Sequence, residues 1–275
     1  TGISLTTNSG ATINFNGGIS LSTGANAAFT ATGGGTVNAT QNNTSIVNTL
    51  ATTTGTALNI ASTTIGASGV TFRSISANGA ANGIVLNATG TSGGLTVTGT
   101  GTTAGTGGTV QNIANRGASF INTRNVSLSN MNFTNTATAA GAPCGSAAVA
   151  AANTGCNAPI HLDTVTNVLL DRLALTTSGQ QGINGLDVTG FTLSNSTLSG
   201  LGNGPDEDGL HFTNMLGTNA ITNTSITSSG DDNVNIQNLV STASTITITG
   251  GSANTGVLGS GYLMGIRGTS NTTVL

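Results

Sequence analysis

The chain has 275 residues, of which only 5% are charged, and its formal net charge is −3. Its basic residues are five arginines, with no lysine. This sparse positive charge excludes binding to nucleic acid or anionic lipid by counterion release. No apolar run approaches the ~20 residues of a membrane span. We therefore expect no nucleic-acid partner and no membrane insertion.

The composition favours strands and tight turns. The sequence contains 42 glycines together with abundant Thr, Asn and Ser, yet 36% of its residues are hydrophobic. Thr, Val and Ile are typical of strands, whereas Gly and Asn are typical of the turns between them. The apolar residues recur in regular apolar-x-apolar triplets, which supply a periodic core and speak against disorder. These features predict an all-β protein.

Residues 1–50 have the least regular pattern. Short triplets at Ile3/Leu5, Ile13/Phe15 and Ile19/Leu21 are separated by Asn- and Gly-rich turns. They predict either narrow first coils or a cap of hairpins, since the terminal repeats of solenoids are commonly atypical. The pattern is already under way at residue 1, so we expect a segment of a longer protein.

Residues 51–275 form the second predicted region, a regular β-helix. The pair Leu58/Ile60 recurs 26 residues later as Ile84/Leu86, and a Gly/Thr-rich bulge at 99–108 lengthens the next turn. Ile160/Leu162 then resumes the pattern after a small-residue insertion at about 136–158.

The insertion carries both cysteines of the chain, Cys144 and Cys156. A cysteine pair that closes a loop in a charge-poor chain is typical of a disulfide, and hence of an oxidising compartment. Two free cysteines are the alternative. A metal site is disfavoured because no histidine or carboxylate pair lies nearby at ligand spacing.

The most regular stretch lies between residues 182 and 250. The pairs Leu186/Val188, Leu210/Phe212 and Val234/Ile236 recur at a spacing of 24 residues, each after a turn-forming cluster. A fixed period in the twenties with strands and no helices is typical of a parallel β-helix. We predict a single-stranded, right-handed parallel β-helix of about 22–26 residues per coil, with right-handedness taken from the crossover rule.

Asparagines follow several of these strands, as at Asn167, Asn195 and Asn223. Asparagine tolerates the left-handed conformation of tight turns. Stacked Asn side chains can also bond one another along the axis, so we expect an internal asparagine ladder.

All eight acidic residues lie after position 160, and five fall in two turns. Asp208 and Asp232 each lie two residues before a strand, so a 24-residue coil places them on adjacent rungs ~4.8 Å apart. Three interpretations remain open: turn chemistry alone, a calcium or carbohydrate contact, or an acid and base for glycoside hydrolysis. Candidate calcium ligands are Asp206, Asp208 and Asp232, and backbone carbonyls and water would have to complete the shell.

The segment from Glu207-Asp208-Gly209 to Asp231-Asp232-Asn233 resembles two consecutive motifs of the polygalacturonases. The resemblance implies three catalytic aspartates: Asp208, Asp231 and Asp232. His211 and Arg267 complete the candidate ligand-binding set, with Asp206 and the three aspartates. The chain departs from the other two family motifs, because it has Gly250-Gly251-Ser252 in place of Gly-His-Gly and Gly265-Ile266-Arg267 without a lysine.

Segments such as Phe29-Thr-Ala-Thr-Gly-Gly-Gly-Thr-Val and Thr123-Arg-Asn-Val-Ser-Leu resemble the large bacterial surface and secreted β-strand-repeat proteins. This resemblance covers most of residues 20–250. It implies an extracellular or cell-surface rod with a structural or adhesive role, whose partners are neighbouring modules, further copies, glycans or a host or solid surface. The alternative is a polygalacturonase-like hydrolase or lyase acting on an acidic polysaccharide, or a carbohydrate-binding relative without turnover. No cofactor other than calcium is expected.

Overall fold

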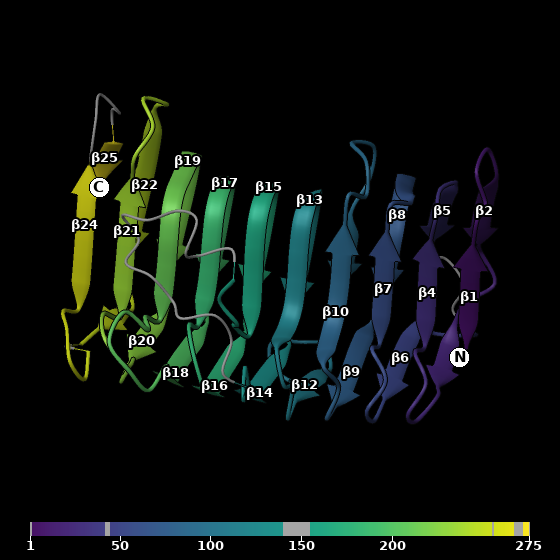
Figure 1. Cartoon of the computed structure of the whole chain (residues 1–275), viewed down its shortest axis with the longest axis horizontal. Helices are drawn as coiled ribbons and strands as arrows, with labels where there is room; N and C mark the ends of the chain where they lie inside the picture. The colour runs from purple at the N-terminus through teal and green to yellow at the C-terminus, as the bar shows by residue number, and fades with distance from the viewer. Residues whose placement is uncertain (1, 42–44, 140–154, 255, 267–271, 275) are drawn as a thin grey trace.

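The computed structural model describes residues 2–41, 45–139, 155–254, 256–266 and 272–274. Within these ranges the protein is an all-β parallel solenoid without helices, as predicted. The coils follow one another along the long axis, and the two ends of the chain lie at opposite ends of the stack (Figure 1). The smaller of the two sheets contains nine strands, one for each of nine consecutive coils.

Each coil contributes to three rows of strands, here called the first arm, the second arm and the third face. The first and second arms together form a 16-stranded sheet, and the third face is the 9-stranded sheet. The first-arm strands are β1 (Ile3–Thr6), β4 (Phe29–Thr32), β7 (Leu58–Ala61), β10 (Asn82–Asn87), β21 (Val234–Asn238) and β24 (Tyr262–Ile266). The second-arm strands are β2 (Thr12–Phe15), β5 (Thr36–Ala39), β8 (Thr64–Phe72), β11 (Leu95–Val97), β22 (Ser244–Thr249) and β25 (Thr272–Val274).

In the central coils one long strand runs through both arms. These strands are β13 (Arg116–Ser129), β15 (Ile160–Asp171), β17 (Ile183–Ser194) and β19 (Leu210–Thr222). The third face contains β3 (Ser20–Ser22), β6 (Thr49–Thr52), β9 (Ser74–Asn78), β12 (Thr109–Gln111), β14 (Asn132–Thr136), β16 (Ala174–Ser178), β18 (Thr197–Leu201), β20 (Ser225–Thr227) and β23 (Ser252–Ala253).

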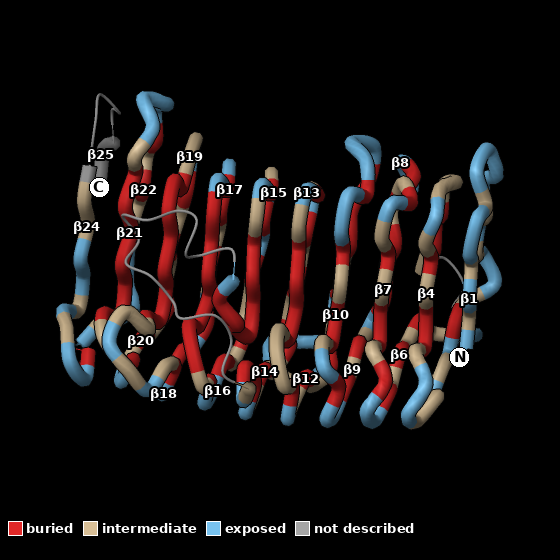
Figure 2. Tube along the Cα trace, viewed as in Figure 1, coloured by how far each residue is buried: buried red, intermediate tan, exposed pale blue. Residues whose placement is uncertain are grey.

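The predicted apolar triplets form the core. Leu58 and Ile60 pair in register with Ile84 and Leu86, as the 26-residue offset predicts. The inward side chains make one continuous cluster from Ile19 to Ile246. Figure 2 shows the front strands β15 to β21 red along much of their length, whereas β1 and β24 show pale blue.

The N-terminal strands belong to the same solenoid. Strands β1, β2 and β3 pair in parallel with β4, β5 and β6 of the following coil. These described strands are therefore coils of the solenoid and do not pair as hairpins, because hairpin partners would be antiparallel. Most of the predicted insertion at about 136–158, including Cys144, lies outside the described residues. Cys156 is fully buried, and its pairing with Cys144 stays a prediction.

The predicted range of about 22–26 residues per coil is too narrow. Equivalent positions are separated by 23 residues between His161 and Asn184 but by 42 between Asn125 and Asn167. The excess residues lie in the connections between strands, because a loop can lengthen without disturbing the register of the strands that it joins. The bulge at 99–108 lengthens its coil in this way, and positions 89 and 123 are 34 residues apart.

The predicted 24-residue match of Leu186/Val188 with Leu210/Phe212 is wrong. The structure pairs Ile183 with Leu210 and Gly185 with Phe212. Glycine is required opposite the phenylalanine because a Cβ on Gly185 would lie 2.3 Å from the Phe212 ring. The next match, Leu210 with Val234 and Phe212 with Ile236, has the predicted offset.

Candidate functional site

The acidic turns before β19 and β21 stack on one another. Asp208 and Asp232 are 24 residues apart, and the Gly209 N–H donates to the Asp232 carbonyl at 3.0 Å. Because the two turns occupy adjacent rungs, the carboxylates of Asp208, Asp231 and Asp232 come within 4.8 Å of one another. The structure therefore brings together the three aspartates that the polygalacturonase resemblance implies.

Asp208 is fully buried, and both of its carboxylate oxygens accept hydrogen bonds. Oδ1 accepts from the backbone N–H of Asp232 at 2.9 Å. Oδ2 accepts from His211 Nδ1 at 2.5 Å and from Asn235 Nδ2 at 3.0 Å. An ionised carboxylate only accepts, so Nδ1 of His211 carries the proton in this contact. Asp208 thus connects its own coil to the following one.

The other acidic side chains also bind turn backbone. Asp232 Oδ1 accepts from the N–H of Ser260 at 2.5 Å, in the next coil. Asp231 Oδ2 accepts from the N–H of Asp206 at 3.0 Å, in the preceding coil. Burial raises the pKa of Asp232, and the charges of Asp208 and Asp231 raise it further against the opposing Ser260 hydrogen bond. The cluster is therefore a set of like charges held between backbone donors.

The candidate calcium set differs from the group that comes together. Among the described residues, the close carboxylate group contains Asp231 and does not include Asp206. Asp206 instead adopts the left-handed conformation with φ of 59° and contributes its backbone N–H to Asp231. Arg267, the predicted cationic member of the site, lies outside the described residues.

A buried polar row runs along the first arm, and of its members only His211 was predicted from the sequence as a site residue. His161, Asn184, His211 and Asn235 occupy one register position on consecutive coils. Along each strand these residues alternate with core-facing side chains, so they lie on the outer face of the sheet. Even so, three of them are fully buried and Asn235 is only 5% exposed. No local motif marks this row, because its members become neighbours only when the coils stack.

His161 is the most perturbed member of this row. Its Nδ1 accepts from Asn184 Nδ2 at 3.0 Å, and Nε2 has no hydrogen-bond partner within the described ranges. Burial, reinforced by the positive charge of Arg116, lowers the pKa of His161 to about 3. The imidazole is therefore neutral at physiological pH.

Asparagine ladders form at the turns, although on the surface rather than inside as predicted. Asn112 bridges Asn78 and Asn135, with both hydrogen bonds at 2.7 Å. Asn167 donates to Asn125 at 3.0 Å. All of these contacts are exposed, and Asn112, Asn125, Asn135 and Asn167 have positive φ.

Comparison with known proteins gives no match: no family model matches the chain, and neither a curated protein nor a solved structure does. The parallel β-solenoid is thus established by the structure alone. No helix among the residues that the structure describes is long and apolar enough to cross a membrane.

Proposed function

We propose that the chain is a structural segment of a large extracellular protein, a rigid β-solenoid rod for surface attachment, self-assembly or glycan contact. The observation that carries this proposal is the hydrogen bonding of the acidic turns. Asp208, Asp231 and Asp232 each accept a backbone N–H from a neighbouring coil, and Asp208 has no exposed surface. Carboxylates used in this way hold coils together.

Low charge supports the same role. With charged residues at 5% of the chain, lateral or end-to-end packing of rods desolvates few ions. The predicted Cys144–Cys156 disulfide and the resemblance to bacterial surface repeat proteins support an extracellular or cell-surface location. Neighbouring modules of the same chain and further copies are the expected partners.

A polysaccharide hydrolase is the second candidate, favoured by the convergence of the three aspartates. Asp232, with its raised pKa, would be the acid. Asp208 is, however, fully buried, and its two carboxylate oxygens are occupied by hydrogen bonds with Asp232, His211 and Asn235. The missing histidine motif and the absence of lysine also weigh against turnover.

An assay of reducing-end release from polygalacturonate and a panel of other polysaccharides tests the proposal. The intact chain is compared with an Asp208→Asn/Asp232→Asn double variant. We expect no release from either protein. Release by the intact chain that disappears in the double variant would replace the structural role with an active site.

The stability of the single variant Asp208→Asn gives an independent readout. The Nδ2 group of an asparagine at position 208 is a donor, and it would face another donor: His211 Nδ1 and Asn235 Nδ2 on one side, or the Asp232 N–H on the other. We therefore expect the free energy of unfolding to fall by about 1–3 kcal/mol, measured by urea denaturation. An unchanged or increased stability would be typical of a catalytic residue and would contradict the structural role.

A further inference from the structure

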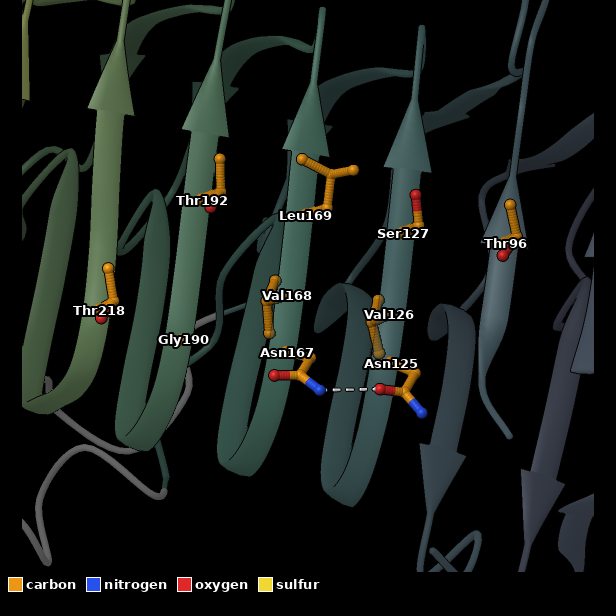
Figure 3. Close-up of a pocket in the computed structure, with 10 residues that line it drawn as sticks. All are labelled: Thr96, Asn125, Val126, Ser127, Asn167, Val168, Leu169, Gly190, Thr192 and Thr218. Carbon is orange, nitrogen blue, oxygen red and sulfur yellow. Dashed lines mark hydrogen bonds between the residues drawn. The ribbon is translucent and has the colours of Figure 1, made fainter. Parts of the chain in front are cut away.

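A groove lies on the outer face of the second arm, away from the acidic turns. It has a volume of about 540 Å³ and crosses strands β11, β13, β15, β17 and β19 (Figure 3). Its long dimension therefore follows the solenoid axis across five consecutive coils. The residues that line it are Thr96, Asn125, Val126, Ser127, Asn167, Val168, Leu169, Gly190, Thr192 and Thr218.

The floor of the groove is a row of outward side chains in one register. Thr96 pairs with Ser127, Ser127 with Leu169, and Leu169 with Thr192. Successive members are therefore one strand spacing of ~4.8 Å apart. Leu169 stands in the middle of the row with 42% of its surface exposed.

One wall of the groove is made by the turn asparagines. Asn125 and Asn167 both have positive φ, and Asn167 Nδ2 donates to Asn125 Oδ1 at 3.0 Å. Figure 3 shows this pair on the same side of the floor residues. In the next coil the ladder position is Gly190, with φ of 74°, so the wall ends where the side chain is missing.

We propose that this groove binds a linear, uncharged polysaccharide lying along the solenoid axis. The inference rests on the proposed function, in which the rod contacts glycans without cleaving them. None of the lining residues carries a charge. They offer hydroxyl and amide groups for sugar hydroxyls, and the aliphatic surface of Leu169 for the apolar face of a sugar ring.

The geometry favours a repeating linear ligand over other occupants. Each coil presents a side chain at a step of ~4.8 Å, which is close to the length of one hexose unit, so successive sugars meet successive coils. A second copy of the chain fits less well, because a two-fold interface requires a self-complementary patch and two grooves would enclose a void. An acidic polysaccharide would find no cation in the lining.

Affinity electrophoresis in gels containing soluble β-1,4-glucan, β-1,3-glucan, xylan or mannan tests the proposal, with polygalacturonate as the charged comparison. We expect at least one neutral polymer to retard the intact chain more than polygalacturonate does. The key variant is Gly190→Asn, which extends the asparagine wall along the groove by one coil and adds one amide for sugar hydroxyls. Asparagine suits the left-handed backbone, and the nearest atom to the new Cβ, Asn167 Oδ1, is 3.4 Å away.

Gly200→Asn is the matched control. Gly200 lies in β18 on the third face with φ of 64°, and the nearest atom to its new Cβ is 4.0 Å away. We expect Leu169→Asp to weaken binding by about tenfold or more, Gly190→Asn to strengthen it, and Gly200→Asn to leave it unchanged. Circular dichroism confirms that each variant is folded.

Two outcomes overturn the proposal: retardation by none of the neutral polymers, or retardation that both groove variants leave unchanged. Either result leaves the structural role standing. Conversely, sugar release that depends on Asp208 would overturn the structural role, while the groove variants would still decide where a neutral polymer binds.

Discussion

Turn asparagines are the residues that most directly determine the shape of each coil. Asn125, Asn130, Asn167 and Asn195 all have positive φ, which few other side chains tolerate. Their amides also bond across coils, as Asn195 Nδ2 does to Asp171 Oδ1 at 2.8 Å. Their use as turn residues could be predicted from sequence, but the coil each one contacts could not.

The buried imidazole of His161 makes folding sensitive to acid. Its pKa is about 3 in the folded protein, against about 6.5 in an unfolded chain. Because the folded value is the lower one, the unfolded state takes up the proton first as pH falls. The contribution of neutral His161 to the free energy of unfolding is therefore fully present above about pH 6.5. It is lost as the pH falls to about 3, by at most about 1.4 kcal/mol per pH unit.

Urea unfolding between pH 7 and pH 5, above the range in which most carboxylates titrate, measures this effect. His161→Asn places at this position the residue type that Asn184 and Asn235 supply in the same row. We expect the variant to have a flatter dependence of unfolding free energy on pH. Identical slopes for the two proteins would contradict the assignment to His161.

At the scale of the element, the pairing of two strands depends on whether a large side chain on one faces a residue without a side chain on the other. Gly185 in β17 lies opposite Phe212 in β19, and Phe212 packs on Phe191 with ring centroids 4.9 Å apart. A side chain at position 185 would occupy the space of the ring. The local register of these two long strands therefore depends on one glycine.

Gly185→Ala should lower the unfolding free energy by about 1–3 kcal/mol, because the added methyl group overpacks a filled core. Gly17→Ala is the control, since no atom of the described residues lies within 4 Å of the added Cβ. We expect the control to change stability by less than about 0.5 kcal/mol.

Combining Gly185→Ala with Phe212→Leu should restore part of the loss, because the smaller side chain releases the space. Chemical denaturation of the two single variants and the double variant measures this coupling. Additive losses would show that the contact between positions 185 and 212 is not the cause.

At the scale of the whole molecule, stability comes from contacts between neighbouring coils. Strands β13, β15 and β17 pair along most of their length with a strand on each side. Strand β1 pairs only with β4, and β24 only with β21, among the described residues. In such a stack, the local unfolding free energy follows from the number of neighbouring interfaces.

Hydrogen exchange should therefore be slowest in β13 to β19 and progressively faster toward β1 and β24. Mass spectrometry of peptic fragments measures this gradient, with the third-face strands β14 and β16 as an internal reference. Uniform protection from β1 to β24 would mean that the solenoid opens as one cooperative unit.

The all-β class, the parallel stacking and the adjacency of Asp208 and Asp232 could all be predicted from the amino-acid sequence. These follow from the alternation of apolar residues and from the 24-residue offset between Leu210/Phe212 and Val234/Ile236, which no insertion interrupts. The sequence also placed Asp231 in the same turn as Asp232, but it did not predict that both carboxylates would bind backbone N–H groups of other coils.

The coil lengths, the buried row containing His161 and the groove along the second arm became visible only in the folded structure. The physical reason is that a connecting loop can absorb extra residues without shifting the strands that follow it. Which side chains then become neighbours depends on the summed length of each coil. Their burial depends on those neighbours, so it has no signature in the residues themselves.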